Sequence, residues 1–381
     1  MTEQTLVYEM PGRTELIGNH SDHQGGLVIS SPIDRCIHAE VTRRGDRQVI
    51  VDSEGHPVVT VDLDDLKLRD EEKGTATALV RGAAKYLADR GFKLRGFTAR
   101  TRSDVPAGSG MSSSAAFEVL VAKILFDLAD RAGVSAAAEM TETELLAQAG
   151  YYAETQYYGK PCGLQDQLSI ASGEPVLMDF ADPDKPTAEP VRFDPAAHGY
   201  RLCLVQTGAS HADLSDDFTA IVEEMKAVAA YFGKDVLHEL DPELLRKQRG
   251  EVIETLGERP VIRAEHFFEE QVRVRRAKDA MIAGDIEQVL ALVKASGRSS
   301  MEKLQNIIPA NGDQTMKRAI DLSEQILDGA GLTRVHGGGF AGTIQAYVPV
   351  GMAGHYQKEM ERVLGAGACL FVELAKKHEK E

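Results

Sequence analysis

The chain has 381 residues, enough for two domains with a large buried core. Hydrophobic residues make up 43% of the chain and charged residues 27%, a balance typical of globular proteins in water. The net charge of -16 argues against nonspecific binding to nucleic acid or to an anionic membrane, so a phosphate site here has to be built locally.

The cysteines and the N-terminus indicate a cellular compartment. The four cysteines are widely scattered and lack metal-type spacing, as is typical of reduced thiols in the cytosol. The first residues lack the basic and apolar regions of a signal peptide, and no apolar run is long enough to cross a bilayer. We therefore expect a cytoplasmic protein that has neither nucleic acid nor membrane as a partner.

The N-terminal part reads as strands around a polar loop. Met10-Pro11-Gly12 is expected to end a first strand at residues 4–9, and an apolar strand follows at 27–33. The loop between them, Gly12–Gly26, holds Arg13, His20, Asp22 and His23 among four glycines. That density predicts a site for a polar small molecule. Alternating or helical spacing then predicts strands at 36–42, 47–52, 57–63 and 94–102 and a helix at 75–90.

The segment Val105–Ala116 combines glycines and serines directly before an apolar helix predicted at 113–132. Glycine lets the backbone approach a ligand closely, and the first N–H groups of a helix attract anions. We interpret this segment as an anion site, with phosphate as the usual anion.

Two carboxylates follow at a suggestive spacing. Glu154 lies near the end of a helix predicted at 142–158, and Asp166 lies twelve residues later, beyond a Gly/Pro turn. Two carboxylates converging from different elements suit one metal ligand and one base. A capping Asp and an exposed Glu would have the same spacing, so both interpretations stay open.

The second half begins after a Pro-, Asp- and Gly-rich stretch, 173–198, which we expect to be a loop or domain junction. It opens with a strand at 201–205 and continues with helices at 214–232, 241–254, 261–283 and 315–329. The pattern Gly337-x-Gly339-x-x-Gly342 precedes a strand at 343–350, whereas a Rossmann motif requires a helix there. A last helix at 352–364 and a strand at 368–374 complete the chain.

Three of these motifs, in this order, resemble those of the GHMP kinases, the superfamily of galactokinase, homoserine kinase, mevalonate kinase and phosphomevalonate kinase. The galactokinase branch has the pattern Gly-Arg-Val-Asn-Leu-Ile-Gly-Glu-His-Thr-Asp-Tyr-Asn-Gly-Gly. The matching residues of this chain are Gly12, Arg13, Leu16, Ile17, Gly18, His20, Asp22, Gly25 and Gly26. The segments Pro106–Ala116, 153–167 and Gly337–Gly342 resemble the phosphate loop, the catalytic region and the C-terminal glycine motif.

The resemblance implies an α+β, two-domain architecture of mixed sheets and packed helices, with the active site in the cleft between the domains. The N-terminal domain would span 1–198 and include the phosphate loop, and a ferredoxin-like C-terminal domain would span 199–381. The implied activity is ATP-dependent phosphorylation of the C1 hydroxyl of galactose or a closely related sugar, with Mg2+.

The resemblance also assigns roles to residues. Asp166 would be the base that faces the sugar hydroxyl, and Arg13 would stabilise charge on the transferred phosphoryl group. Ser114 and Glu154 would hold Mg2+. The triphosphate would contact Pro106, Gly108, Ser109, Gly110, Ser112, Ser113 and Ser114. The sugar pocket would include Asn19, His20, Asp22, Gly163 and Phe218.

The departures from the pattern fall in the recognition pockets. Asn19 replaces a Glu, which removes a negative charge from the sugar site, and His23 is expected to add a positive one. Phe218 stands where the family has a Tyr near the sugar, and Ala76 and Leu79 stand where it has aromatic residues beside adenine. Galacturonate is therefore an alternative acceptor. A non-catalytic sugar/ATP sensor on the same fold is a less favoured alternative, because Arg13, Ser114, Glu154 and Asp166 are all present.

Overall fold

The computed structural model describes residues 5–106, 110–131, 140–160, 162–183, 185–209 and 214–375. Contacts divide the chain into two compact units. Unit 1 holds Met1–Arg13, Pro32–Ala107 and Met111–Gly173, and unit 2 holds Thr14–Ser31, Gly108–Gly110 and Glu174–Glu381. The chain therefore crosses between the units within its first two strands, β1 (Leu6–Ile17) and β2 (Leu27–Arg43).

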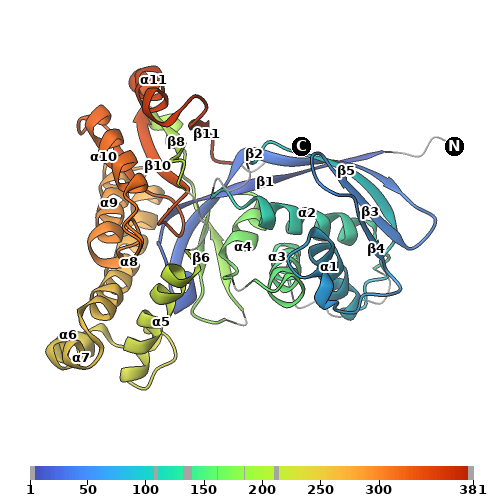
Figure 1. Ribbon diagram of the computed structural model, residues 1–381, viewed down its shortest axis with the longest axis horizontal. Coiled ribbons are helices and arrows are strands. Elements are labelled where there is room, and N and C mark those ends of the chain that lie inside the picture. The colour runs from blue at the N-terminus through green and yellow to red at the C-terminus, as the bar shows by residue number, and fades with distance from the viewer. Residues whose placement is uncertain are drawn as a thin grey trace. The chain divides into compact units, whose positions relative to one another are not determined.

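Unit 1 is built on a mixed sheet (Figure 1). Strands β3 (Gln48–Ser53), β4 (Val59–Asp62) and β5 (Phe97–Ser103) join the second half of β2 in the order β4-β3-β5-β2. β3 pairs antiparallel with β4 and parallel with β5, and β5 pairs antiparallel with β2. Val49 and Val51 of β3 and Val59 and Val61 of β4 are buried and the residues between them are not, as the alternating pattern predicts.

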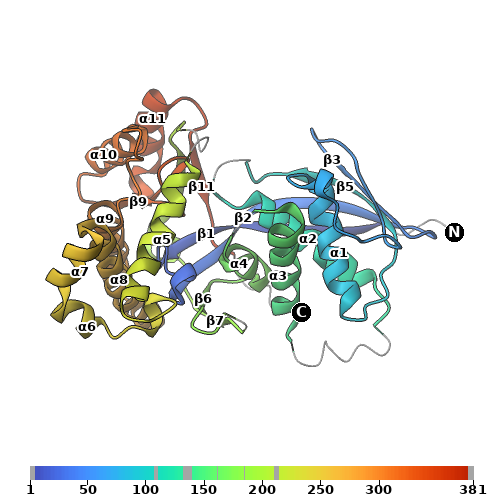
Figure 2. The same ribbon diagram turned by 60° about the horizontal axis from the view of Figure 1, so that its bottom comes forward.

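Among its described residues, unit 1 also contains the helices α1 (Ala76–Asp89), α2 (Ser113–Leu128), α3 (Glu142–Tyr152) and α4 (Gln165–Ser172). They pack against one another (Figures 1 and 2). Thr75 caps α1 by accepting a hydrogen bond from the Ala78 N–H, and Thr141 and Glu144 form a capping box at α3. α2 is buried around most of its circumference, which explains its nearly continuous apolar sequence.

Unit 2 contains a four-stranded antiparallel sheet in the order β11-β8-β10-β9. Its strands are β8 (Tyr200–Gln206), β9 (Leu332–Val335), β10 (Thr343–Pro349) and β11 (Cys369–Val372). Helices α10 (Thr315–Leu327) and α11 (Ala353–Leu364) share a buried apolar cluster with this sheet. In the same unit, the start of β2 pairs with β6 (Val176–Asp179), and β6 pairs with β7 (Thr187–Pro190).

The helical part of unit 2 has its own core. Helix α8 (Glu258–Ala283) packs against α5 (Ser215–Tyr231), α7 (Arg249–Leu256) and α9 (Ile286–Ser299), and the short helix α6 (Pro242–Lys247) precedes α7. The second apolar cluster joins buried side chains of α5, α7 and α8. The structure thus contains both the predicted helices and the predicted sheets, and the fold is α+β as expected.

Several predicted boundaries were wrong. β1 runs through Pro11 and Gly12 instead of ending there, which is compatible with proline because β1 pairs with a single neighbour, β2. The stretch predicted as a loop at 173–198 contains β6 and β7. Helix α9 and strand β9 were not predicted, and the helix predicted at 241–254 is divided into α6 and α7.

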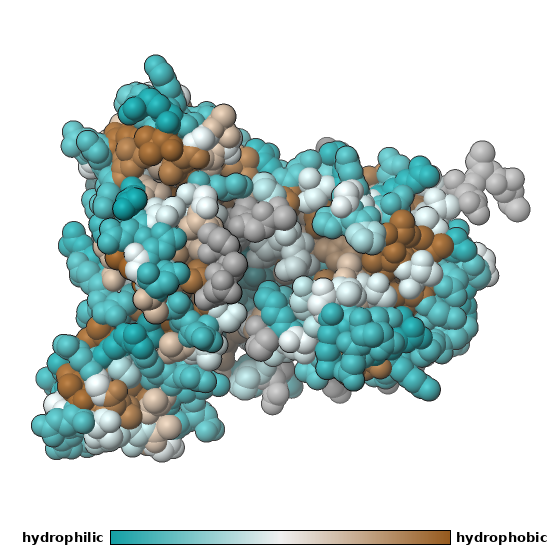
Figure 3. Space-filling model, in the orientation of Figure 1, coloured by the Kyte–Doolittle hydropathy of each residue, from teal (hydrophilic) through white to brown (hydrophobic). Residues whose placement is uncertain are grey.

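The surface agrees with the composition. Figure 3 shows mostly hydrophilic side chains on the face it presents, with smaller apolar patches between them. Within the described ranges, no helix combines the length and the apolar character that a membrane span requires. All four cysteines are free thiols, as expected from their spacing.

Candidate active site

Arg13 and Asp166 form a two-pronged ion pair inside unit 1. The Arg13 Nε lies 2.6 Å from Asp166 Oδ1, and Arg13 Nη2 lies 2.8 Å from Oδ2. The guanidinium is almost buried, with 9% of the side chain exposed, whereas the Asp166 side chain is 34% exposed. A fork of this kind fixes the orientation of the carboxylate as well as its charge. It brings together the two residues predicted to be catalytic.

The backbone around Gly12 explains why Arg13 lies there. The Arg13 N–H donates to the Met111 carbonyl over 3.0 Å. A Cβ on Gly12 would lie 2.7 Å from that same oxygen, so only glycine allows β1 to approach the segment before α2 this closely. The glycine preceding Arg13 in the motif is thus required by packing.

Asp166 is more acidic than an ordinary aspartate. Burial raises its pKa, but the Arg13 charge, the Arg13 hydrogen bonds and a hydrogen bond donated by the Ser112 hydroxyl outweigh burial, and the pKa lies below its usual value. Asp166 is therefore ionised at neutral pH. It lies in the first turn of α4, where the helix dipole also favours negative charge.

The predicted phosphate loop leads into α2 with unusual backbone angles. Ser112 has φ +58° and Gly110 has φ +71°, both in the left-handed region. A left-handed serine costs conformational energy, and such residues gather at functional sites. Ser113 and Ser114 form the first turn of α2, Pro106 precedes the loop, and Gly108 and Ser109 lie outside the described residues.

Glu154 lies on a π-helical turn, Ala153–Tyr158, that continues α3. Its carboxylate is buried, with 4% of the residue exposed, and binds Lys160 Nζ over 2.8 Å and Gln167 Nε2 over 2.8 Å. The same Gln167 nitrogen donates to the buried Glu118 Oε2 over 2.9 Å. Because the two carboxylates share one nitrogen, they lie close together in unit 1.

Sequence reasoning missed Glu118, Lys160 and Gln167. Glu118 carried a signal, because it is a charged residue in the apolar run that became α2. Burial beside Glu154 raises its pKa to about 8, with burial the larger cause and Glu154 the second. Oε1 of Glu118 has no hydrogen-bond partner among the described residues. Uncompensated acceptor capacity of this kind suits a bound cation.

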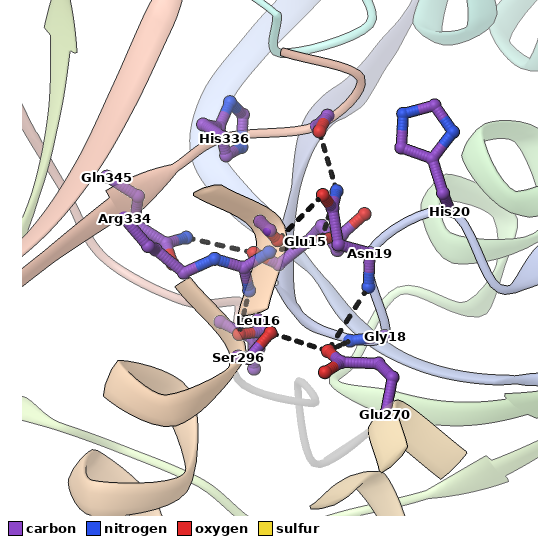
Figure 4. Close-up of polar contacts among 12 residues, drawn as sticks. Glu15, Leu16, Gly18, Asn19, His20, Glu270, Ser296, Arg334, His336 and Gln345 are labelled. Carbon is purple, nitrogen blue, oxygen red and sulfur yellow. Dashed lines mark hydrogen bonds and ion pairs between the residues drawn. The ribbon is translucent and has the colours of Figure 1, made fainter. Parts of the chain in front are cut away.

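In unit 2, Asn19 is the centre of a buried polar network (Figure 4). Its Nδ2 donates to Glu15 Oε1 over 3.2 Å and to the Gly337 carbonyl over 2.7 Å. Its Oδ1 accepts from Ser300 and from Asn306. All four hydrogen-bonding positions of the amide are thereby occupied. The contact between Asn19 and a sugar stays a prediction.

Glu270 on α8 holds the backbone of the same turn. Its Oε1 accepts from the N–H groups of Gly18 and Asn19 and from the Ser296 hydroxyl (Figure 4). His266, one helical turn earlier, donates from Nε2 to the Asn19 carbonyl, and its Nδ1 lies 2.8 Å from Ser299 Oγ. Helices α8 and α9 therefore determine the conformation of the 18–20 turn.

His20 and His23 form a chain that is complete when both rings are neutral. Gln24 donates to His23 Nδ1, His23 Nε2 donates to His20 Nδ1, and His20 Nε2 donates to the Gly338 carbonyl. Burial lowers the pKa of both rings, that of His23 well below its ordinary value. The expectation that His23 adds a positive charge was therefore wrong, because the lowered pKa leaves this half-buried ring uncharged at neutral pH.

The other predicted sugar residues have different surroundings. Asp22 begins a 3-10 turn, Asp22–Gln24, and Gly163 is exposed between the π-helical turn and α4. The Phe218 ring packs edge-on against Phe340, and a Cβ on Gly338 would lie 2.7 Å from Phe218 Cε1. Phe218 thus lies against the glycine-rich segment of unit 2 that precedes β10.

Comparisons with known proteins agree with these motifs. The model "GHMP kinases N terminal domain" matches residues 78–174, and the "Galactokinase galactose-binding signature" matches residues 2–43. Galactokinases of Actinobacillus pleuropneumoniae serotype 5b and Glaesserella parasuis serovar 5 are each 27% identical over 356 residues. Each alignment covers 91% of this chain and 86% of the relative.

Solved structures show the same fold. Lactococcus lactis galactokinase complexed with galactose superposes with a TM-score of 0.80 at 24% identity, covering 98% of this chain and 95% of that one. Methanococcus jannaschii mevalonate kinase superposes with a TM-score of 0.67 at 14% identity, covering 99% of this chain and all of the other. The chain thus contains a GHMP kinase N-terminal domain and a galactokinase galactose-binding signature, and it is similar to galactokinases along most of its length.

Proposed function

We propose that this chain is an ATP-dependent sugar kinase that phosphorylates the C1 hydroxyl of galactose or a closely related sugar. The observation that carries the proposal is the Arg13–Asp166 fork, joined by Ser112 at the start of α2. A cation and an ionised carboxylate held next to a helix N-terminus are what phosphoryl transfer to a hydroxyl requires.

In this proposal Asp166 orients the sugar hydroxyl and accepts its proton. The low pKa of Asp166 keeps the carboxylate ionised, but it also makes Asp166 a weak base. Such a base suits a loose transition state, in which the hydroxyl loses its proton late and positioning matters more than proton removal. Arg13 holds Asp166 in place and supplies positive charge for the transferred group.

The triphosphate is assigned to the start of α2. Ser112, Ser113 and Ser114 present hydroxyl groups and the first N–H groups of the helix, and Gly110 has a left-handed backbone with φ +71°. Pro106, Gly108 and Ser109 stay in the proposal as loop residues. Since the net charge of the protein is -16, a local site of this kind is needed to bind an anion.

The residues also suit Mg2+. Ser114 and Glu154 offer hydroxyl and carboxylate oxygens, which Mg2+ prefers, and Glu118 Oε1 has no hydrogen-bond partner among the described residues. When bound, the metal would neutralise charge on the phosphates. Hydrogen bonds from Lys160 and Gln167 fix the orientation of the Glu154 carboxylate.

The sugar is assigned to His20, Asp22, Gly163 and Phe218, with galactose as the favoured acceptor. The neutral His20–His23 chain offers no cation for the carboxylate of a uronate. Galacturonate remains the second candidate because the family Glu is absent at position 19. Phe218 packs on the glycine segment and offers an apolar surface instead of a hydroxyl.

A panel of sugars tests the proposal. ADP release is measured with galactose, galacturonate and glucose, each with ATP and with GTP, and the product is identified by its anomeric phosphorus signal. We expect the highest kcat/KM with galactose and ATP. A higher value with galacturonate would reverse the acceptor assignment. Sugar and nucleotide binding without ADP release would favour the non-catalytic sensor instead.

A further inference from the structure

Positions 15 and 19 contain an exchanged pair of residues. The galactokinase pattern quoted above has Asn at the first of these positions and Glu at the second, whereas this chain has Glu15 and Asn19. The two side chains touch, because Asn19 Nδ2 donates to Glu15 Oε1 over 3.2 Å (Figure 4). The chain therefore keeps one carboxylate and one amide but reverses their order.

The exchange moves the carboxylate to a site where it is neutralised. Glu15 is 3% exposed, and Oε1 also accepts from Nη2 of the fully buried Arg334 over 2.7 Å. Nη1 of Arg334 donates to the Leu16 carbonyl over 2.7 Å, which anchors the guanidinium on β1 itself. A buried ion pair of this kind strongly resists loss of either partner, since the remaining charge would be left unpaired.

The Asn19 amide makes a set of hydrogen bonds that a carboxylate at this position cannot make. Asn19 donates to the Gly337 carbonyl and accepts from Asn306, which itself donates to the Gly338 carbonyl over 3.1 Å. Only a group that both donates and accepts can make these bonds together. Asn19 thus ties the 18–20 turn to the glycine segment at 337–339.

We propose that Asn19 is a positioning residue rather than a sugar ligand, and that it holds His20 and the 18–20 turn in their binding conformation by crosslinking them to Gly337 and Asn306. The inference rests on the proposed function, since sugar binding is its readout. His20 depends on such support, because its φ of +57° is unfavourable for a residue with a side chain. Its Nε2 meets the Gly338 carbonyl of the same crosslinked segment.

The test removes only the donor. In the full-length chain, Asn19→Asp keeps the shape but places a carboxylate against Glu15 Oε1 and the Gly337 carbonyl, which are both acceptors. We expect the KM for galactose to rise about tenfold or more, as for a buried polar group left unsatisfied, with the KM for ATP changed less than twofold. Ser300→Ala removes one donor to Asn19 Oδ1 and should raise the KM for galactose by a smaller factor.

A reciprocal exchange distinguishes positioning from general damage. Asn19→Glu alone adds a carboxylate beside Glu15, whereas Asn19→Glu with Glu15→Asn restores one carboxylate and one amide near Arg334. The double variant restores the charge balance beside Arg334 but supplies no donor for the Gly337 carbonyl. It should therefore recover at least half of the Tm lost by Asn19→Glu, while its KM for galactose stays raised. The matched control is Asn311→Asp, at an exposed site where Oδ1 only accepts a hydrogen bond, from the Asp313 N–H.

The outcomes separate the two proposals. If wild-type protein releases no ADP with any sugar, the proposed function fails before Asn19 is tested. If wild type is active and Asn19→Asp has an unchanged KM for galactose, Asn19 does not position the turn. A double variant whose KM for galactose returns to the wild-type value would also overturn the inference, because its position-19 carboxylate cannot donate to the Gly337 carbonyl. Should Asn19→Asp not fold, the KM of Ser300→Ala decides, and an unchanged value refutes the crosslink.

Discussion

Replacing Asp166 by Asn tests the proposed catalytic pair with the smallest change in shape. The substitution keeps one oxygen and the volume, but it removes the charge that faces the Arg13 guanidinium, whose side chain is 9% exposed. Breaking a fully buried pair costs about 3–5 kcal/mol, and an exposed pair is worth about 1 kcal/mol or less. Because Asp166 is a third exposed, we expect a loss of about 1–2 kcal/mol, and the protein stays folded.

The loss of activity should be much larger than the loss of stability. The amide cannot accept the proton of the sugar hydroxyl, and general-base help is worth roughly 10²–10⁴ in rate. The Ser112 hydroxyl also loses its charged acceptor. Nucleotide affinity should be retained, because Arg13 and the start of α2 are unchanged and one negative charge near the phosphates has gone.

The assay compares kcat for ADP release, affinity for a non-hydrolysable ATP analogue by calorimetry, and Tm. Asp285→Asn is the matched control, since Asp285 is an exposed cap of α9 that accepts from the Gln288 N–H, and Asn caps helices equally well. We expect kcat to fall at least about 100-fold in Asp166→Asn only. Turnover of Asp166→Asn within a few fold of wild type would refute the role of Asp166 as base.

Three further predictions concern the same unit. Arg13→Lys replaces the two-pronged guanidinium by a point charge, so the pKa of Asp166 should rise toward its ordinary value. The acid limb of the kcat/KM profile should then move to higher pH. An acid limb at the wild-type pH contradicts this prediction. Glu154→Gln should weaken Mn2+ binding to the complex with the ATP analogue by at least about tenfold, as measured by electron paramagnetic resonance, and unchanged affinity would remove Glu154 from the metal site. Gly82→Ala should lower Tm, because the added Cβ would lie 2.7 Å from the Ala153 Cα, where the π-helical turn begins. The control Gly250→Ala, on α7, has open space around the added Cβ and should leave Tm equal or higher. Equal Tm changes in the two variants would show that the close approach of Gly82 is not required.

Much of unit 1 could be predicted from local pattern. The alternation in β3 and β4, the helical spacing of α1 and the apolar run of α2 all depend on side chains that are close in sequence. The motif residues Arg13, Ser112, Glu154 and Asp166 were identified for the same reason, because each lies in a short segment with a recognisable pattern. β6, β7 and β9 have four residues each, too few for a reliable period.

Local sequence pattern was sufficient for the α+β class, for the resemblance to galactokinases and for the segments expected to form the site. The partners of the residues that depart from the family pattern became visible only in the folded chain. Asn19 meets Gly337 across 318 residues, and Glu15 meets Arg334 across 319. No rule of sequence spacing connects positions so far apart. Burial makes the Glu15 charge require Arg334 and lowers the pKa of His23, so that its ring stays neutral, and burial exists only once the chain is folded.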